Sequence, residues 1–356
     1  MEDGVITVKL PFVAILSAAL GFSTPTLAQV APASGQGNLA GARAEVPIHQ
    51  TILKDGNVRY WIPVRIGNSR PVETMLDTGS AGLRILPDAV AADNYAATDR
   101  QNVYGYGSGV KITGVIADAR VTVGGAAIEA PIPIQLIRSV GCYEKKPKCP
   151  ASRLTLENYG LGGDGIPNQG FKAIIGIDTP PPGLKFAVVN PLMHMGGGVW
   201  IVIVPLPGQS EPGKLIINPD PKDLEGFTWF RHLVLVPPHK RGHLSACLHN
   251  ENTGRAFCGP LVLDTGAPGI HLSSLLVKRQ RVWPQGMQGS YQFGDATGRP
   301  LKMNFTVNRA LPGSRVTIEP ETGQYSDIIY AGILPYFSFA VLYDAPNNAM
   351  ALRPRR

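Results

Sequence analysis

One short sequence pattern occurs twice, once in each half of the chain, and this repeat constrains the fold more than any other feature. The first copy reads Thr74-Met-Leu-Asp-Thr-Gly-Ser-Ala-Gly-Leu83, and the second reads Leu261-Val-Leu-Asp-Thr-Gly-Ala-Pro-Gly-Ile270. In both copies hydrophobic residues precede Asp-Thr-Gly and a small residue follows it. The repeat predicts a duplicated architecture made of two similar halves.

The aspartates of the two copies, Asp77 and Asp264, each follow a strand-like hydrophobic run that fixes where the carboxylate points. If the two turns meet at a pseudo-twofold axis, the two carboxyl groups lie too close together to be ionised at the same time, so one proton is held between them. The pKa values then belong to the pair. Such a pair can take a proton from a water that attacks an amide carbonyl, while its protonated member protonates the carbonyl oxygen. We therefore predict that Asp77 and Asp264 form a catalytic pair.

The residues that follow each aspartate have supporting roles that can be predicted. A glycine lets the backbone turn sharply with its N–H aimed at the carboxylate, and a threonine hydroxyl can bond across to the opposite loop. A serine follows the first turn and can bond the outer oxygen of Asp77, whereas Ala267 stands at the matching position after the second turn. The predicted supporting residues are Thr78, Gly79, Ser80, Thr265 and Gly266.

The composition favours an all-β protein. Only 17% of the 356 residues are charged, while 41 glycines and 32 prolines supply many turns, a mix that suits short strands better than long surface helices. The runs 46–53 and 59–66 predict a hairpin around Asp55-Gly56. Helix signals are few: 87–92 and 272–277 could each form one or two helical turns.

The N-terminus resembles a secretory signal peptide. Residues 10–22 form an apolar run too short to span a bilayer, and small residues then suit cleavage after Ala28. Residues 29–44 are rich in Ala, Gly, Pro and Ser and indicate a flexible linker. We therefore expect an exported protein, periplasmic or extracellular, with no stable membrane anchor once the signal is removed.

Four cysteines fall into two close pairs, Cys142 with Cys149 and Cys247 with Cys258. Export makes disulfides the leading interpretation, although spacing alone does not prove the pairing. A zinc site is the alternative, but it would favour tighter Cys-x-x-Cys or neighbouring His spacing. The histidines at 232, 239, 243 and 249 are spaced irregularly, so we expect no metal and no cofactor.

The net charge of +7 and the basic clusters at 239–241, 278–281 and 353–356 leave open a polyanion-binding protein. Solvated loops and a frayed terminus are the favoured explanation of these clusters, and we expect no nucleic-acid partner. A phosphate-cradling loop at 105–109 is a further alternative. It is disfavoured because a strand pattern, not a helix, follows it, and no Lys-Ser/Thr ends it.

Several segments, in the same order along the chain, resemble the pepsin-like aspartic peptidases. Residues 60–67 resemble that family's strand and glycine-containing turn ahead of its first catalytic loop. Residues 103–108, which include Tyr104 and Gly105, are similar to its substrate-covering flap. The hydrophobic run 173–177 is similar to the segment that backs its first active-site loop. Residues 331–337 and 340–352 resemble the equivalent segment of the second half and the closing strand pair. The matches extend over nearly the whole mature chain.

The resemblance implies a bilobal all-β fold, with an N-terminal lobe at 45–206 and a C-terminal lobe at 207–356 separated by a cleft. It implies an aspartic endopeptidase that acts as a monomer on a polypeptide held in extended conformation, without a metal or cofactor. Tyr104 and Gly105 are the expected flap residues, although Tyr104 could also be an ordinary strand aromatic.

Three departures from the family pattern are visible. Arg84 stands where these peptidases usually have a tryptophan that supports the flap tyrosine, and an Arg beside the cleft could favour acidic or polar substrate side chains. The glycine expected in the second-half backing segment is replaced around Leu334-Pro335. Because Ala267 gives Asp264 no hydroxyl donor, we expect a less acidic working pH than that of digestive pepsins. The departures at Arg84 and Leu334-Pro335 leave open a catalytically silent pepsin-fold binding or inhibitor protein.

Overall fold

The computed structural model describes residues 41–180, 185–232, 244–294, 301–320 and 327–355. The predicted signal peptide, most of the predicted linker, and two of the four histidines considered as metal ligands, His239 and His243, lie outside these residues. Within the described parts the protein is all-β, as the composition predicts. Its helices are three 3-10 turns, Pro87–Ala89, Ala92–Asn94 and Pro191–His194, and the five-residue α1 (Leu334–Ser338).

The predicted first hairpin is confirmed. Strands β1 (Ala44–Ile52) and β2 (Val58–Ile66) pair antiparallel. The connection turns at Gly56, whose φ of 82° favours glycine, and Asp55 Oδ1 accepts a bond from the N–H of Asn57 at 2.9 Å. Turn chemistry local to Asp55-Gly56 therefore sets the register of the hairpin.

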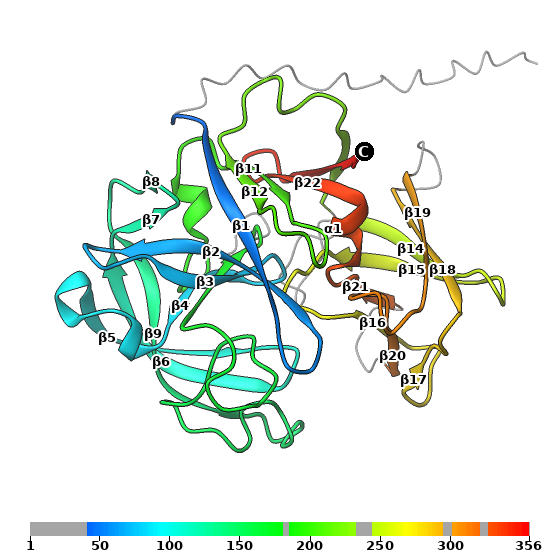
Figure 1. Ribbon diagram of the computed structural model, residues 1–356, viewed down its shortest axis with the longest axis horizontal. Helices are drawn as coiled ribbons and strands as arrows, with labels where there is room; N and C mark the ends of the chain where they lie inside the picture. The colour runs from blue at the N-terminus through cyan, green and yellow to red at the C-terminus, as the bar shows by residue number, and fades with distance from the viewer. Residues whose placement is uncertain (1–40, 181–184, 233–243, 295–300, 321–326, 356) are drawn as a thin grey trace, which may run out of the picture. The chain divides into compact units, whose positions relative to one another are not determined.

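In the described parts of the chain the strands form two sheets (Figure 1). The larger sheet runs in the order β13 (Thr228–Arg231), β23 (Ala349–Pro354), β22 (Phe339–Asp344), β11 (Val199–Ile203), β12 (Gly213–Ile217), β1, β2, β3 (Val72–Asp77), β10 (Ala173–Ile177), β4 (Ala81–Ile85), β9 (Ile132–Cys142), β6 (Val110–Ala119) and β5 (Ala96–Gly105). In addition, β7 (Val121–Val123) pairs with β2, and β8 (Ala126–Ala127) pairs with β7. The smaller sheet runs in the order β17 (Arg281–Val282), β20 (Val316–Pro320), β16 (Ile270–Ser274), β21 (Asp327–Tyr330), β15 (Arg255–Val262), β14 (Leu244–Asn250), β18 (Gln288–Phe293) and β19 (Leu301–Thr306).

The two sheets repeat one strand arrangement around the two Asp-Thr-Gly segments. In the larger sheet, β10 runs parallel to β3 and antiparallel to β4, and β4 runs parallel to β9. In the smaller sheet, β21 runs parallel to β15 and antiparallel to β16, and β16 runs parallel to β20. The sequence repeat is thus matched by a repeat of strand order and direction.

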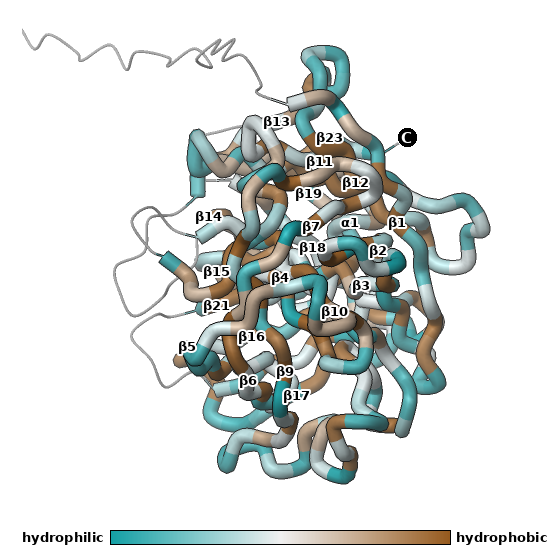
Figure 2. The backbone as a smooth tube through the Cα atoms, turned by 90° about the vertical axis from the view of Figure 1, so that its left-hand side faces the viewer, coloured by the Kyte–Doolittle hydropathy of each residue, from teal (hydrophilic) through white to brown (hydrophobic). Residues whose placement is uncertain are grey.

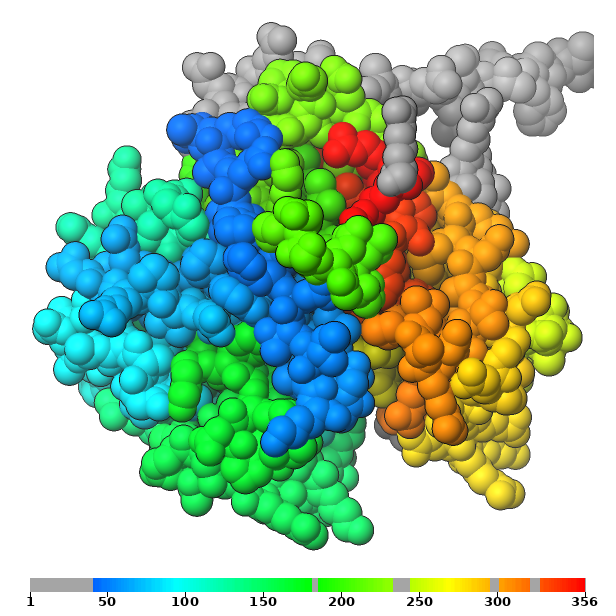
Figure 3. Space-filling view, in the orientation of Figure 1, coloured from blue at the N-terminus to red at the C-terminus, as the bar shows by residue number. Residues whose placement is uncertain are grey.

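The larger sheet also joins segments that lie far apart in the sequence. It takes β1 from near the start of the described chain and β22 and β23 from its end, through β11 and β12. In Figure 3, β1 (blue), the segment near residue 205 (green) and the C-terminal strands (red) meet at the surface. Both expected halves, 45–206 and 207–356, therefore contribute strands to this sheet.

The core is formed by the inward-facing side chains of both sheets. The largest fully buried side chains include Trp200, Tyr60, Tyr291, Tyr336 and Tyr343. Figure 2 shows the hydrophobic stretches running through the strands and the hydrophilic stretches in the outer connections. This distribution buries apolar surface in the strands and leaves the polar connections in water.

One of the two helix predictions is wrong. Residues 87–92 contain the 3-10 turn at Pro87–Ala89, but 272–277 begin inside strand β16. β16 lies between β20 and β21 and bonds to both, so tertiary pairing overrides the weak local helix signal.

Candidate active site

The two Asp-Thr-Gly segments form equivalent turns just beyond two strands. Asp77 is the last residue of β3, and Asp264 lies two residues beyond the end of β15. The N–H of Gly79 donates to Asp77 Oδ1 at 3.0 Å, and the N–H of Gly266 donates to Asp264 Oδ1 at 2.8 Å. In each turn the glycine amide reaches back to the carboxylate, the geometry that the sequence predicts.

The next donor differs between the two turns. The hydroxyl of Ser80 bonds to Asp77 Oδ2, so both oxygens of this buried carboxylate accept a hydrogen bond. At the matching position the backbone N–H of Ala267 bonds to Asp264 Oδ1 at 3.2 Å. The serine therefore adds a hydroxyl donor to the first carboxylate, and the alanine cannot add one to the second.

The two turns are joined by reciprocal hydrogen bonds between their threonines. Thr78 N–H donates to Thr265 Oγ1 at 3.1 Å, and Thr265 N–H donates to Thr78 Oγ1 at 2.9 Å. Each hydroxyl also donates to a carbonyl of the opposite strand: Thr78 to Leu263 at 3.0 Å, and Thr265 to Leu76 at 2.7 Å. Both threonines are buried, so four bonds shielded from water fix one turn against the other.

This contact brings the two carboxyl groups together. A Cβ added to Gly79 would lie 2.3 Å from Cγ of Asp264, and a Cβ added to Gly266 would lie 2.7 Å from Oδ1 of Asp77. Each glycine thus faces the carboxylate of the other turn, and any larger residue would push that carboxylate away. These two positions therefore require glycine because there is no room for a side chain, and not only because the backbone turns sharply.

A backing segment supports each turn. Gly176 of β10 packs against the backbone of Ser80, since an added Cβ would lie 2.6 Å from Ser80 carbonyl carbon. In the second half, Gly332 packs against the carbonyl of Gly269, and the Gly332 carbonyl accepts the N–H of Asp264 at 3.4 Å. The backing glycine expected near Leu334-Pro335 is therefore not missing. It is Gly332, with a φ of 62°.

Two buried tyrosines, which sequence reasoning did not single out, extend the threonine network. The hydroxyl of Tyr336 donates to Thr78 Oγ1 at 2.8 Å and is also bonded to the hydroxyl of Tyr343. Burial raises the pKa of both tyrosines, so both stay protonated. α1 and β22 are thereby tied to the first turn. Aromatic residues in hydrophobic segments near the end of the chain predict that the rings are buried. They do not predict which partner each hydroxyl bonds to.

The segment predicted as a flap is the hairpin of β5 and β6. Tyr104 pairs with Ile112 and Gly105 pairs with Lys111, and the chain reverses between them. A Cβ on Gly105 would lie 2.3 Å from the ring of Tyr143, so this glycine admits close packing of that ring. The next residue, Tyr106, lies edge-on to Tyr104 with ring centroids 5.1 Å apart.

Arg84 lies directly beneath this hairpin. Its guanidinium carbon is 3.5 Å from the centre of the Tyr104 ring, a cation–π contact between β4 and β5. Nη1 donates to the carbonyls of Ala81 and Gly82 at 2.9 and 3.2 Å. Arg84 therefore contacts Tyr104, the tyrosine of the predicted flap, through a cation and not through an indole ring.

A second buried arginine, Arg59 of β2, was not singled out from the sequence. Its Nε donates to the carbonyl of Gly162 at 2.8 Å. Burial lowers the pKa of Arg59, and the negative charges of Asp55, Asp264 and Asp77 oppose that shift. Both aspartates therefore lie within electrostatic reach of Arg59. The signal that could have identified it is a charged residue within a strand that is otherwise mostly hydrophobic.

The structure contains the two disulfides considered from the spacing, Cys142–Cys149 and Cys247–Cys258. Among the described residues, no group of three or more His, Cys, Asp or Glu side chains is placed to hold a metal ion. In the same residues no helix has the length and apolar character needed to cross a membrane.

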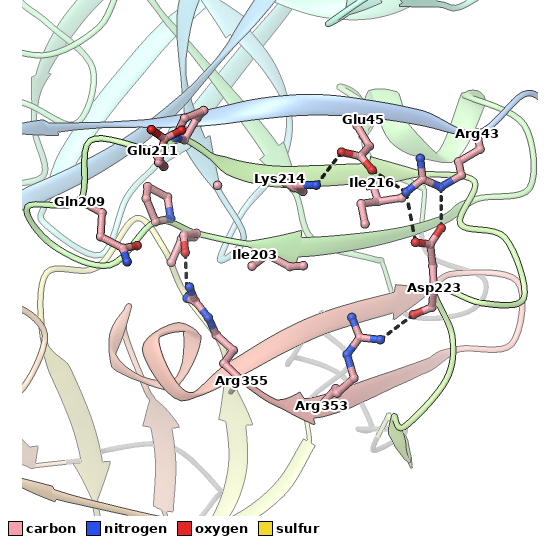
Figure 4. Close-up of a pocket in the computed structure, with 14 residues that line it drawn as sticks. Arg43, Glu45, Ile203, Gln209, Glu211, Lys214, Ile216, Asp223, Arg353 and Arg355 are labelled. Carbon is pink, nitrogen blue, oxygen red and sulfur yellow. Dashed lines mark hydrogen bonds and ion pairs between the residues drawn. The ribbon is translucent and has the colours of Figure 1, made fainter.

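A separate pocket of about 400 Å³ lies against β11, β12 and the end of β23 (Figure 4). Arg43 bonds to Asp223 at 2.6 and 3.1 Å and to Glu45 at 2.6 Å, and Lys214 pairs with Glu45 at 3.0 Å. Neither Asp-Thr-Gly turn lines this pocket. Asp223 and Glu45 are thus neutralised by basic groups of the pocket itself.

Comparison with known proteins adds no assignment: no protein-family model matches the chain, and no curated protein matches it. The functional interpretation therefore rests on the geometry of the two turns.

Proposed function

We propose that this chain is an aspartic endopeptidase with a bilobal, pepsin-like fold, in which Asp77 and Asp264 activate a water between them. The observation that carries the proposal is the reciprocal Thr78–Thr265 contact, which faces each carboxylate toward the glycine of the opposite turn. The repeated strand order around the two turns supports the two-lobed architecture.

The chemistry follows from two carboxyl groups that share one proton. The ionised member accepts a proton from a water, whose oxygen attacks the carbonyl carbon of a peptide bond, while the protonated member gives its proton to the carbonyl oxygen. The tetrahedral intermediate then collapses: the carboxyl group that took the water's proton gives it to the nitrogen, and the C–N bond breaks. The other carboxylate takes a hydroxyl proton from the intermediate, so a carboxylic acid and an amine leave and the pair again holds one proton. No metal and no cofactor enters these steps.

The substrate in this proposal is a polypeptide in extended conformation, lying between the Asp turns and the β5–β6 hairpin. A monomer suffices, because one chain supplies both aspartates. Two disulfides are compatible with an exported protein, periplasmic or extracellular. Because Ser80 has no hydroxyl counterpart at Ala267, the proposal includes a working pH above that of digestive pepsins.

The test is digestion of a denatured protein by the mature chain beginning near Gln29, with and without a pepstatin-type inhibitor. We expect peptide products that the inhibitor abolishes. Asp264→Asn should give none, whereas Asp99→Asn, a change at an exposed aspartate, should digest normally. A folded protein that binds the inhibitor or peptides but yields no products would favour the catalytically silent binding protein.

A further inference from the structure

Arg84 is a buried cation without a described counter-ion. Arg84 is only 2% exposed. Among the described residues, no carboxylate lies within ion-pair distance of it. Arg43, by contrast, is partly exposed and bonds to two carboxylates. A buried positive charge is costly unless it is paired, so an unpaired one beside a candidate active site calls for an explanation.

The neighbours of Arg84 occupy only part of its guanidinium. Tyr104 covers one face, and the carbonyls of Ala81 and Gly82 both bind Nη1. Nε is buried and has no hydrogen-bond partner in the described structure, and no described residue bonds to Nη2. The edge formed by Nε and Nη2 is the one that an arginine uses to hold a carboxylate through two parallel bonds.

A second buried donor belongs to Tyr106, which packs against Tyr104 as Arg84 does. The hydroxyl of Tyr106 is buried and has no hydrogen-bond partner in the described structure, and its ring packs edge-on against Tyr104. Burial raises its pKa, while the charge of Arg84 acts in the opposite direction, which places the phenol within the electrostatic reach of the arginine. The phenol is therefore neutral and can donate a hydrogen bond. Two buried donors and one uncompensated positive charge define a site that an anionic acceptor would complete.

We propose that Arg84 and Tyr106 bind an acidic side chain of the substrate, so that the preferred polypeptide carries Asp or Glu close to the cleaved bond. This inference rests on the proposed function. Arg84 lies in β4, the strand that follows the Asp77 turn, and contacts Tyr104 of the predicted flap hairpin, so it touches both structures that would enclose a peptide. The carboxylate takes the Nε edge while Tyr104 keeps the face of the guanidinium, with the hairpin lifting to admit the side chain.

The experiment compares short peptides that differ only by Glu or Gln at each position around the cleaved bond. In the wild-type protein we expect kcat/KM to be about tenfold to a hundredfold higher for Glu than for Gln at one position, the range of a charge-assisted hydrogen-bonded pair. Arg84→Met should bring this ratio close to one, and Arg84→Lys should keep part of it. Equal cleavage of Glu and Gln peptides by the wild type, or a preference that persists in Arg84→Met, would overturn the proposal.

Equilibrium binding of the same fluorescent peptide pairs separates this inference from the proposed function. If no peptide is cleaved but the Glu peptide binds more tightly than its Gln partner, and Arg84→Met removes the difference, the peptidase proposal fails and the acidic-side-chain site stands. If neither peptide binds or is cleaved, both fail. The wild-type Glu and Gln comparison needs no variant, so a misfolded Arg84→Met protein leaves the test intact.

Discussion

Replacing Thr265 by valine removes two of the four bonds that join the Asp turns while keeping the shape of the side chain. The carbonyl of Leu76 loses its donor at 2.7 Å, and the N–H of Thr78 loses its acceptor at 3.1 Å. Both groups are buried, and a buried polar group left without a partner costs about 1–3 kcal/mol. The free energy of unfolding should therefore fall by roughly 2–6 kcal/mol, a large part of the ~5–15 kcal/mol typical of a folded protein.

Thr265→Ser is the matched control, because it keeps the hydroxyl and removes only a methyl group. Its cost should be near 1 kcal/mol, the value of about one buried methyl. Thr306→Val makes the same chemical change as Thr265→Val at an exposed position of β19 and should alter stability by less than about 0.5 kcal/mol.

Urea unfolding followed by tryptophan fluorescence measures all three variants, with stabilities compared at a constant slope against denaturant. The reasoning is refuted if Thr265→Val is as stable as Thr265→Ser. That result would mean that the two turns are held together by packing, and that the threonine bonds add nothing to it.

Two further predictions concern residues away from the carboxylates. Burial lowers the pKa of His232 to about 4, below the ~6.5 of an unfolded histidine, so its contribution to stability is complete above about pH 6.5 and is lost as the pH falls toward 4. Between these pH values the free energy of unfolding of His232→Gln, measured by urea titration, should fall by up to about 3 kcal/mol less than that of the wild type. Parallel pH profiles for the two proteins would contradict this. Tyr336→Phe removes the donor to Thr78 and the partner of Tyr343, and should lower the free energy of unfolding by about 1–3 kcal/mol in the same assay; a loss below about 0.5 kcal/mol would show that the hydroxyl is dispensable.

The His232 prediction also bears on working pH. A protein that becomes less stable below about pH 6 is poorly suited to strong acid, which agrees with the expectation drawn from Ala267. The two arguments are independent, since His232 bonds weakly to Thr179, at 3.5 Å, and belongs to neither turn.

The sequence predicted best what local chemistry determines. Asp-Thr-Gly specifies a turn whose amide meets its own carboxylate, and Asp55-Gly56 specifies a tight hairpin, so both could be expected from a few adjacent residues. The duplicated pattern then indicated that the two turns belong together. Thr78 and Thr265 were expected to bond across for the same reason.

Contacts between distant segments could not be predicted in this way. Nothing near Tyr336 indicates that its hydroxyl reaches Thr78, because that bond depends on how α1 packs against the first turn. The helix expected at 272–277 is partly strand, since pairing with β20 and β21 decides it. The backing glycine was misplaced by a few residues because Leu334-Pro335 was aligned with it in place of Gly332.

The measurement that tests the central claim most directly is the pH dependence of kcat/KM for one peptide, in the wild type and in Asp77→Asn and Asp264→Asn. A pair that shares one proton predicts a bell-shaped wild-type profile and a loss of about a hundredfold to ten-thousandfold in either variant at every pH. A variant that keeps wild-type turnover, or a profile with a single titration, would contradict the account.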